Sequence, residues 1–238
     1  MTDVADNLQR VRDRLAAACA HSGRAAASVR LVAVSKRVPL DLVAAAVAHG
    51  QLDLGENRIQ DALPRQVELA ARLEPAAAAG LRWHFIGPLQ ANKVRKAVGR
   101  FALIHAVDSL PLARRIAEVA LEQGLRQPVL LEINAAREPG KFGLDPDEAV
   151  TAAVVAAALP GLDVRGLMAM ARQDAPPAEL GATFGRVRRL AEAARAATGL
   201  ALPDLSMGMS DDFEIAIAEG ATLVRLGTAV FGERPPRG

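Results

Sequence analysis

The chain has 238 residues, of which 51% are hydrophobic, so it is long enough to form one large domain around a single core. Its 29 basic and 27 acidic residues leave a formal charge of +2, and the basic residues are scattered, so no basic stripe indicates a nucleic-acid partner. The single cysteine, Cys19, excludes an internal disulfide framework and a cysteine-rich metal site.

The N-terminal stretch MTDVADNLQRVRDRLAAACA alternates charged and apolar side chains at helical spacing and therefore predicts an amphipathic helix. It lacks the unbroken apolar segment of a secretory signal peptide. No later stretch is apolar over the length that a bilayer requires. These features predict a cytoplasmic protein without a membrane partner.

Short apolar runs then alternate with amphipathic stretches rich in Ala, Arg and Glu. The apolar runs predict eight strands, at 30–34, 52–57, 84–87, 103–108, 128–134, 164–170, 204–209 and 223–228. Several of the stretches between them begin with Asp, Asn or Ser and end on Gly, as capped helices do. This order predicts an α/β fold, a single-domain (β/α)8 TIM barrel over residues 1–238 that is preceded by an N-terminal helix. A doubly wound open sheet is the alternative fold, because the number of strands does not prove closure.

In a parallel barrel the functional groups lie at the C-terminal ends of the strands and in the loops that follow them. This sequence repeatedly places chemically distinctive residues at those points. Examples from the first six strands are Lys36, Asn57, Asp108, Asn134 and Met168. Their recurrence at one end of every strand predicts a site there.

The last two strands end in motifs that suit a phosphate group. In SMGMSDD, residues 206–212, serine hydroxyls and a glycine backbone precede a predicted helix whose first N–H groups favour an anion. In VRLGTAVFGE, Gly227 lets the backbone approach a ligand, and Thr228 supplies a hydroxyl and an N–H group. Either motif alone is more often a plain helix cap. Together they predict a phosphate site, because such barrels usually hold phosphate after strands seven and eight.

Lys36 would adjoin this phosphate site, because the first strand lies beside the last when a barrel closes. Lysine is scarce in the chain, which has only four, at positions 36, 93, 96 and 141. A lysine amine next to a phosphate site suits a ligand with both a carbonyl and a phosphate group, such as pyridoxal 5'-phosphate (PLP). Arg37 and Arg225 would help to keep part of the amine neutral. The alternatives are an ordinary strand-end charge and a Schiff-base aldolase acting on a phosphorylated sugar.

Six stretches resemble the pyridoxal phosphate homeostasis protein family, also called the YggS or PLPBP (PROSC) family. They are LVAVSK, GENRIQD, WHFIGPLQANK, INAAREPGKFGL, GLMAMA and LSMGMSDDFEIAIAEGATLVRLGTAVFGER, in the same order as in the family. The resemblance implies a barrel of the alanine racemase N-terminal type, with PLP held as a Schiff base on Lys36.

The resemblance also implies roles for other residues. The PLP phosphate would be held by Ser210, Gly227 and Thr228, with Ser206 close by. Arg225 would face the pyridine nitrogen. The family positions that line the rest of the cofactor pocket match Asn57, His84 and Met168.

Two residues depart from the family pattern. Arg58 stands where a tyrosine is usual, and Ala91 stands where a serine usually precedes Asn-Lys. Neither departure affects the lysine or the phosphate motifs. They concern the outer rim of the pocket and the ligand or partner that meets it.

Two features argue against an efficient racemase. An arginine that faces the pyridine nitrogen opposes ring protonation and weakens PLP as an electron sink. Alanine racemases add a tyrosine base from a partner subunit and a second, all-β domain, whereas this chain contains no tyrosine and its length is taken up by the barrel. The dispersed histidines suggest no metal site.

The sequence therefore predicts a monomeric PLP-binding protein of intracellular vitamin B6 homeostasis. It would hold PLP and regulate or supply it, with PLP-dependent apoenzymes as candidate recipients. The alternative that uses the same cofactor is a weak PLP-dependent amino-acid racemase, in which Lys36 acts alone or with His84.

Overall fold

Eight parallel strands form a closed barrel in a computed structural model that describes residues 3–233. The strands are β1 (Arg30–Val34), β2 (Asp53–Glu56), β3 (Arg82–Phe85), β4 (Leu103–Val107), β5 (Gln127–Ile133), β6 (Leu162–Ala169), β7 (Asp204–Ser206) and β8 (Leu223–Leu226). Each strand pairs with the next along the chain, and β1 also pairs with β8. Closure confirms the predicted (β/α)8 barrel and excludes the open doubly wound sheet.

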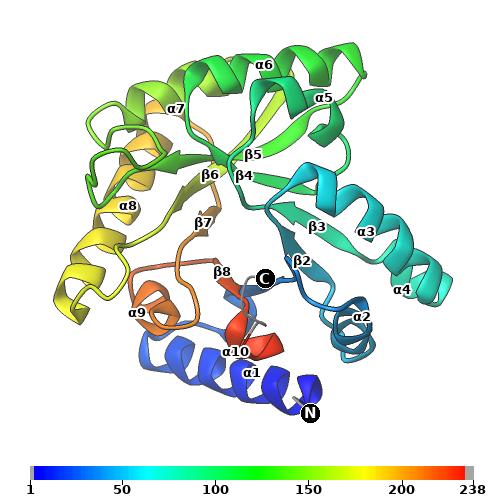
Figure 1. The fold of residues 1–238 in the computed structure, drawn as a ribbon. Coiled ribbons are helices and arrows are strands. Elements are labelled where there is room, and N and C mark those ends of the chain that lie inside the picture. The colour runs from blue at the N-terminus through cyan, green and yellow to red at the C-terminus, as the bar shows by residue number, and fades with distance from the viewer. Residues whose placement is uncertain (1–2, 234–238) are drawn as a thin grey trace.

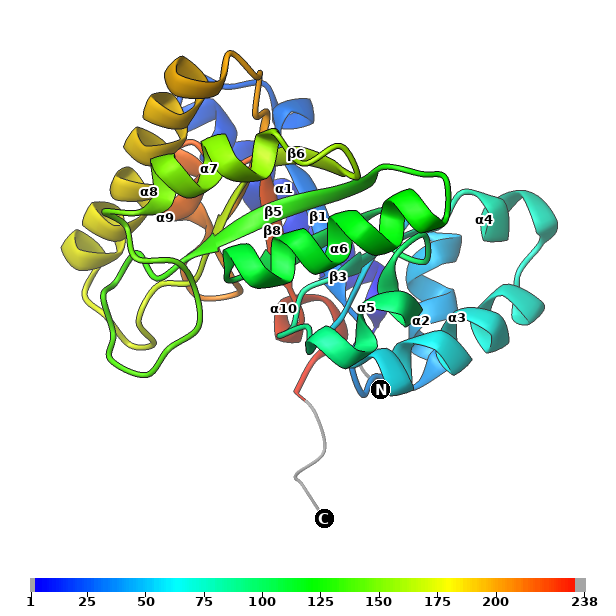
Figure 2. The same ribbon diagram turned by 90° about the horizontal axis from the view of Figure 1, so that it is seen from above.

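Helices lie around the outside of the strands (Figures 1 and 2). They are α1 (Val4–His21), α2 (Leu40–Ala48), α3 (Ile59–Arg72), α4 (Pro75–Ala79), α5 (Val94–Ala97), α6 (Leu110–Glu122), α7 (Ala149–Ala157), α8 (Pro177–Thr198), α9 (Phe213–Ala218) and α10 (Thr228–Phe231). Short 3-10 turns at Ala26–Ser28 and Ala91–Lys93 precede β1 and α5. Within residues 3–233, no helix is both long and apolar enough to cross a membrane.

The predicted N-terminal helix is confirmed as α1, and it packs against α9 and α10 (Figure 1). Asp3 caps its N-terminus, and the Asp3 carboxylate accepts a hydrogen bond from the N–H of Ala5 at 2.9 Å. Its buried side chains recur every three or four residues and include Leu8, Val11, Leu15 and Ala18. Asn7 Nδ2 also donates to the carbonyl oxygen of Val230 at 3.0 Å, which joins the first helix to the last.

The barrel interior contains both apolar and polar side chains. Because side chains alternate along a strand, every second residue of a regular strand points inward. Leu223 and Arg225 of β8 are two such residues, and both are buried. The apolar cluster inside the barrel consists of Val32, Leu103, Ala106, Leu130, Met168 and Leu223. Buried polar residues, among them Ser206, His105 and Arg225, also lie in the interior.

Ion pairs gather at the N-terminal mouth of the barrel. Asp204 of β7 accepts hydrogen bonds from Arg30 at 3.0 Å and from Arg165 at 3.3 Å. Asp53 of β2 accepts two from Arg82, at 2.8 and 2.6 Å. The first group of contacts joins β1, β6 and β7, and the second joins β2 and β3. At this mouth such residues serve stability, whereas function in such barrels lies at the opposite end.

Candidate functional site

Lys36 lies in a tight turn that follows the C-terminal end of β1. The turn is closed by the N–H of Val38, which donates to the carbonyl oxygen of Ser35 at 3.0 Å. Arg37 has a φ of 62°, a left-handed conformation that costs a non-glycine residue about 1 kcal/mol or more. Lys36 is half-buried and Arg37 is exposed. The turn therefore keeps Lys36 at the mouth of the barrel and leaves Arg37 in solvent.

A buried ion pair supports this turn. Ser35 Oγ donates to Glu56 Oε1 at 2.9 Å, and Arg65 Nε donates to the same oxygen at 3.2 Å. Arg65 Nη2 also donates to the carbonyl oxygens of Ser35 and Val38, at 3.0 and 2.7 Å. Burial raises the pKa of Glu56, although the Ser35 hydrogen bond and the Arg65 charge oppose the rise. Arg65 thus ties the turn that carries the lysine to helix α3.

Replacing Arg65 by alanine is expected to lower the free energy of unfolding by about 3 kcal/mol, because buried Glu56 loses its cation and two carbonyls lose a donor. The matched control is Arg72→Ala on the same helix, where the lost partners are the exposed Asp41 and Glu68. That change should cost less than about 1 kcal/mol. Urea unfolding measures both values, and equal losses would show that the Arg65 contacts do not support the turn.

Two hydroxyl groups meet between the ends of β7 and β8, and we call them the Ser210–Thr228 pair. Thr228 Oγ1 donates to Ser210 Oγ at 3.1 Å, and the N–H of Ala229 points to the same oxygen at 3.4 Å. The loop that carries Ser210 requires glycine at Gly208, where φ is 91° and an added Cβ would lie 2.7 Å from the Cβ of Ala216. Hydroxyl and N–H groups gathered in this way suit an oxyanion.

Closure of the barrel brings Lys36 to the same end as the Ser210–Thr228 pair. β1 and β8 pair in register, with Ala33 opposite Leu226. The turn with Lys36 and the Gly227–Thr228 segment are therefore the C-terminal extensions of two adjacent strands. Residues that the sequence placed in separate motifs are assembled here at one end of the barrel.

Arg225 provides a buried cation on the strand that leads to this pair. It is 5% exposed, and its Nη1 donates to the carbonyl oxygen and the Oγ of Ser206, at 2.8 and 2.6 Å. Its Nη2 donates to the carbonyl oxygen of Ala169 at 3.1 Å. Burial lowers the pKa of Arg225 to about 10, while Glu132 and Asp212 oppose the fall. The guanidinium therefore remains charged at neutral pH.

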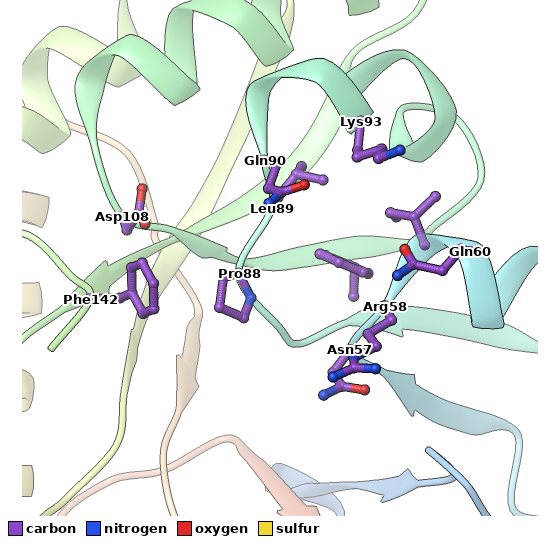
Figure 3. A pocket seen from close by; sticks show the side chains of 11 residues that line it. Asn57, Arg58, Gln60, Pro88, Leu89, Gln90, Lys93, Asp108 and Phe142 are labelled. Carbon is purple, nitrogen blue, oxygen red and sulfur yellow. The ribbon is translucent and has the colours of Figure 1, made fainter.

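Asn57 borders a cavity of about 790 Å³ that opens beside the ends of β2, β3 and β4. Figure 3 shows Asn57 and Arg58 on one side of this cavity and Asp108 and Phe142 on the other. Gly87 allows the loop after β3 to approach Asn57, because an added Cβ would lie 2.4 Å from the Asn57 carbonyl oxygen. Arg58, the first departure from the family pattern, is exposed at this rim.

His84, which the resemblance matches to a position lining the cofactor pocket, lies in the barrel interior toward the N-terminal mouth. It is 2% exposed, and its Nε2 and Nδ1 each make a contact of 2.9 Å, to Asp53 Oδ1 and His105 Nε2. It borders a small cavity at the N-terminal mouth together with Arg30 and Arg82. The cause is the alternation along β3, which turns the ring into the interior. This position does not support His84 as a second base beside Lys36.

Met168 and Ser206 lie in the interior, beneath the C-terminal end of the barrel. They are opposite each other in the pairing of β6 with β7, and neither is more than 1% exposed. Met168 belongs to the apolar cluster, whereas Ser206 contacts Arg225 and the Nδ1 of His105, the latter at 2.9 Å. These two residues therefore support the site from inside the barrel.

Sequence reasoning missed Asp53, Arg65, His105 and Glu132. Glu132 is 4% exposed; burial raises its pKa to about 7, and the charge of Asp108 adds to the rise while Arg225 opposes it. The available signal was an acidic residue within a predicted buried strand, in LDLGEN for Asp53 and in PVLLEIN for Glu132. Within the described part of the chain, no three His, Cys, Asp or Glu side chains are grouped to hold a metal ion.

The fold and this arrangement of residues first define a class of protein. Residues 6–235 match the family described as the alanine racemase N-terminal domain. The barrel is similar to alanine racemase from Corynebacterium glutamicum, with a TM-score of 0.67 at 20% identity over 97% of this chain and 63% of that chain. The likeness shows a shared fold, and the chain is a barrel of the alanine racemase N-terminal type.

More similar proteins narrow the class. The chain is 42% identical to the pyridoxal phosphate homeostasis protein of Pseudomonas aeruginosa, over 98% of this chain and 97% of that protein. It is 40% identical to the Escherichia coli protein of the same name, over 98% of both. PipY of Synechococcus elongatus, whose structure was solved with PLP bound, matches with a TM-score of 0.83 at 39% identity, over 96% of this chain and all of that chain. The chain belongs to the pyridoxal phosphate homeostasis protein family.

Proposed function

We propose that this protein binds PLP at the C-terminal end of its barrel and serves in intracellular vitamin B6 homeostasis. The observation that carries the proposal is that Lys36, the Ser210–Thr228 pair and Arg225 share one end of the barrel, on the neighbouring strands β1, β7 and β8. These groups match the aldehyde, the phosphate and the pyridine nitrogen of PLP. Membership of a family whose member PipY was solved with PLP bound supports the proposal.

Each group has a separate task. When bound, PLP supplies an aldehyde that a lysine amine can link to covalently and a ring that can serve as an electron sink. Lys36 would hold the aldehyde end through Nζ. Arg225 would donate to the ring nitrogen, and because a guanidinium has no acceptor it would keep that nitrogen unprotonated.

The surroundings of the Ser210–Thr228 pair fit a phosphate group. α10 begins at Thr228, so the first N–H groups of this helix add to the two hydroxyls. The neighbouring carboxylate of Asp212 accepts a hydrogen bond from the N–H of Met209 at 2.5 Å, so it is engaged within its own loop. An oxyanion here would meet donors from both strand ends.

Thr228→Ala is expected to weaken PLP binding about tenfold, because one charge-assisted hydrogen bond to phosphate is lost. Titration followed by absorbance measures this dissociation constant. Pyridoxal, which lacks the phosphate, should bind the variant and the parent protein equally. Thr198→Ala is the control, because that hydroxyl donates to Ala194 at the far end of α8. Equal affinity of the parent for pyridoxal and PLP would contradict the phosphate assignment.

A binding role is favoured over racemisation by two observations. The chain has no tyrosine to serve as a second base, and His84 is engaged with Asp53 inside the barrel. Arg225 would also leave the ring a poor electron sink. We further propose that the protein acts in the cytoplasm as a monomer and that PLP-dependent apoenzymes receive the cofactor.

A further inference from the structure

A chain of hydrogen bonds crosses the barrel interior from Arg225 toward the N-terminal mouth. Arg225 Nη1 lies 2.6 Å from Ser206 Oγ, and that oxygen lies 2.9 Å from His105 Nδ1. His105 Nε2 lies 2.9 Å from His84 Nδ1, and His84 Nε2 lies 2.9 Å from Asp53 Oδ1. None of the five residues is more than 6% exposed. These five hydrogen-bonded residues are therefore largely shielded from bulk water.

Asp53 and Arg225 are the two end members of this series of hydrogen bonds, and their chemistry fixes which group donates at each end. Burial alone would raise the pKa of Asp53, but hydrogen bonds from His84 and Arg82 outweigh it and hold this pKa well below its usual range. A carboxylate only accepts, so His84 carries a proton on Nε2. A guanidinium only donates, so Ser206 Oγ accepts from Arg225.

The direction of the middle bonds follows if His84 is neutral. Its Nδ1 then accepts from His105 Nε2, and His105 Nδ1 accepts the single hydroxyl proton of Ser206. Burial lowers the pKa of His105 well below its ordinary value, and the charge of Arg225 adds to the fall. In the reverse arrangement His84 would carry a second proton, and Ser206 Oγ would face two donors at once.

We propose that this series of hydrogen bonds positions Arg225 for the cofactor. His105 and His84 are positioning residues, and Asp53 is the anchor. The inference rests on the proposed function, because it assigns Arg225 to the PLP ring. Ser206 Oγ accepts from Arg225 while its own proton is committed to His105. That commitment leaves the oxygen lone pairs directed at the guanidinium and holds Nη1 in one orientation.

The anchor is itself fixed. Arg82 holds Asp53 through Nε and Nη2, at 2.8 and 2.6 Å. Arg225 also donates hydrogen bonds to two main-chain carbonyl oxygens, those of Ser206 and Ala169. The Ser206 hydroxyl is therefore the side-chain contact through which residues of β2, β3 and β4 act on Arg225. A donor that is oriented before the ring arrives loses little freedom on binding.

The first test measures proton positions in the intact protein. Nitrogen NMR of protein labelled with ¹⁵N-histidine should show His84 and His105 as neutral rings, each with its proton on Nε2. The exposed rings of His21 and His49 serve as internal references for a solvent-facing imidazole. A proton on Nδ1 of His105, or a doubly protonated His84 at neutral pH, would reverse the donor and acceptor roles in these hydrogen bonds and overturn the proposal.

The second test measures coupling to the cofactor. His105→Phe keeps a ring of similar size but removes both hydrogen bonds, and it should raise the dissociation constant for PLP about tenfold and shift the absorption band of bound PLP. In a Ser206→Ala background the series of hydrogen bonds from Arg225 to Asp53 is already interrupted. Adding His105→Phe should therefore change the dissociation constant for PLP less than about twofold. Leu130→Val in the apolar cluster is the control for a loss of stability alone. It should leave the affinity and the band unchanged.

The outcomes separate this inference from the proposed function. If the parent protein binds PLP but the effects of Ser206→Ala and His105→Phe multiply, the two residues act independently and the positioning chain is wrong. If His105→Phe lowers only the melting temperature, its role is structural and the proposal is likewise overturned. Failure of the parent protein to bind PLP would overturn both the proposed function and the proposed role of these hydrogen bonds.

Discussion

Replacing Lys36 by alanine is expected to abolish covalent attachment of PLP and to weaken overall binding by at least about a hundredfold, because only noncovalent contacts remain. The fold should persist, since Lys36 lies in a turn at the barrel mouth and is only half-buried. Treatment with borohydride, followed by mass spectrometry of peptides, locates the linked lysine. The parent protein should carry one label per chain, on Lys36.

The scarcity of lysine allows a sharp control for this experiment. The other lysines are Lys93, Lys96 and Lys141, and all three can be changed to arginine together. That triple variant leaves Lys36 as the sole lysine and should still take up one label per chain. Labelling of Lys36→Ala at another lysine with undiminished affinity would show that the covalent site has been assigned to the wrong residue.

Glu132→Gln is expected to make the PLP-free protein more stable at pH 8 than the parent, by up to about 3 kcal/mol. The folded protein holds Glu132 at a pKa of about 7, raised chiefly by burial, against an ordinary value of 4.5. Between these two values the native state binds more protons than the unfolded state, so the contribution of Glu132 falls as the pH rises. Glutamine mimics the protonated carboxyl group and does not titrate.

The difference between the two proteins should therefore grow from pH 5 to pH 8 and then level off. Urea unfolding at several pH values, without PLP, measures it. Glu74→Gln is the control, because Glu74 is exposed and its replacement should leave the free energy of unfolding nearly unchanged. A difference that stays constant with pH would mean that Glu132 is ionised in the native state at neutral pH.

The fold could be predicted from sequence because each strand and helix has a local signature. Buried runs such as LVAV and PVLLEIN mark strands whether or not their neighbours are known. The end of the barrel that carries the candidate site followed from the direction of parallel strands. The meeting of Ser210 with Thr228 followed likewise from their places after two consecutive strands.

Contacts inside the barrel could not be predicted in this way. His105 looked dispersed along the chain with His21 and His49, yet its ring is hydrogen-bonded to that of His84. His105 also contacts Ser206, which lies 101 residues further on. Such contacts depend on which layer of the barrel each side chain enters, and that layer depends on the stagger of neighbouring strands. A shift in register between β4 and β5 shows that the stagger is not uniform. Arg65 was missed for a related reason, because its reach from α3 back to the first turn has no sequence signature.

The bond between Asn7 and Val230 has a consequence for the order in which the protein is made. These two residues are 223 positions apart, and they join helices α1 and α10. A ribosome releases α1 first, but that helix finds its docking surface only after α9, β8 and α10 have been synthesised. The Ser210–Thr228 pair is completed by the same late segment. The nascent chain therefore lacks this pair, our proposed phosphate site, until nearly all of the barrel has left the ribosome, so we expect capture of the cofactor to follow synthesis.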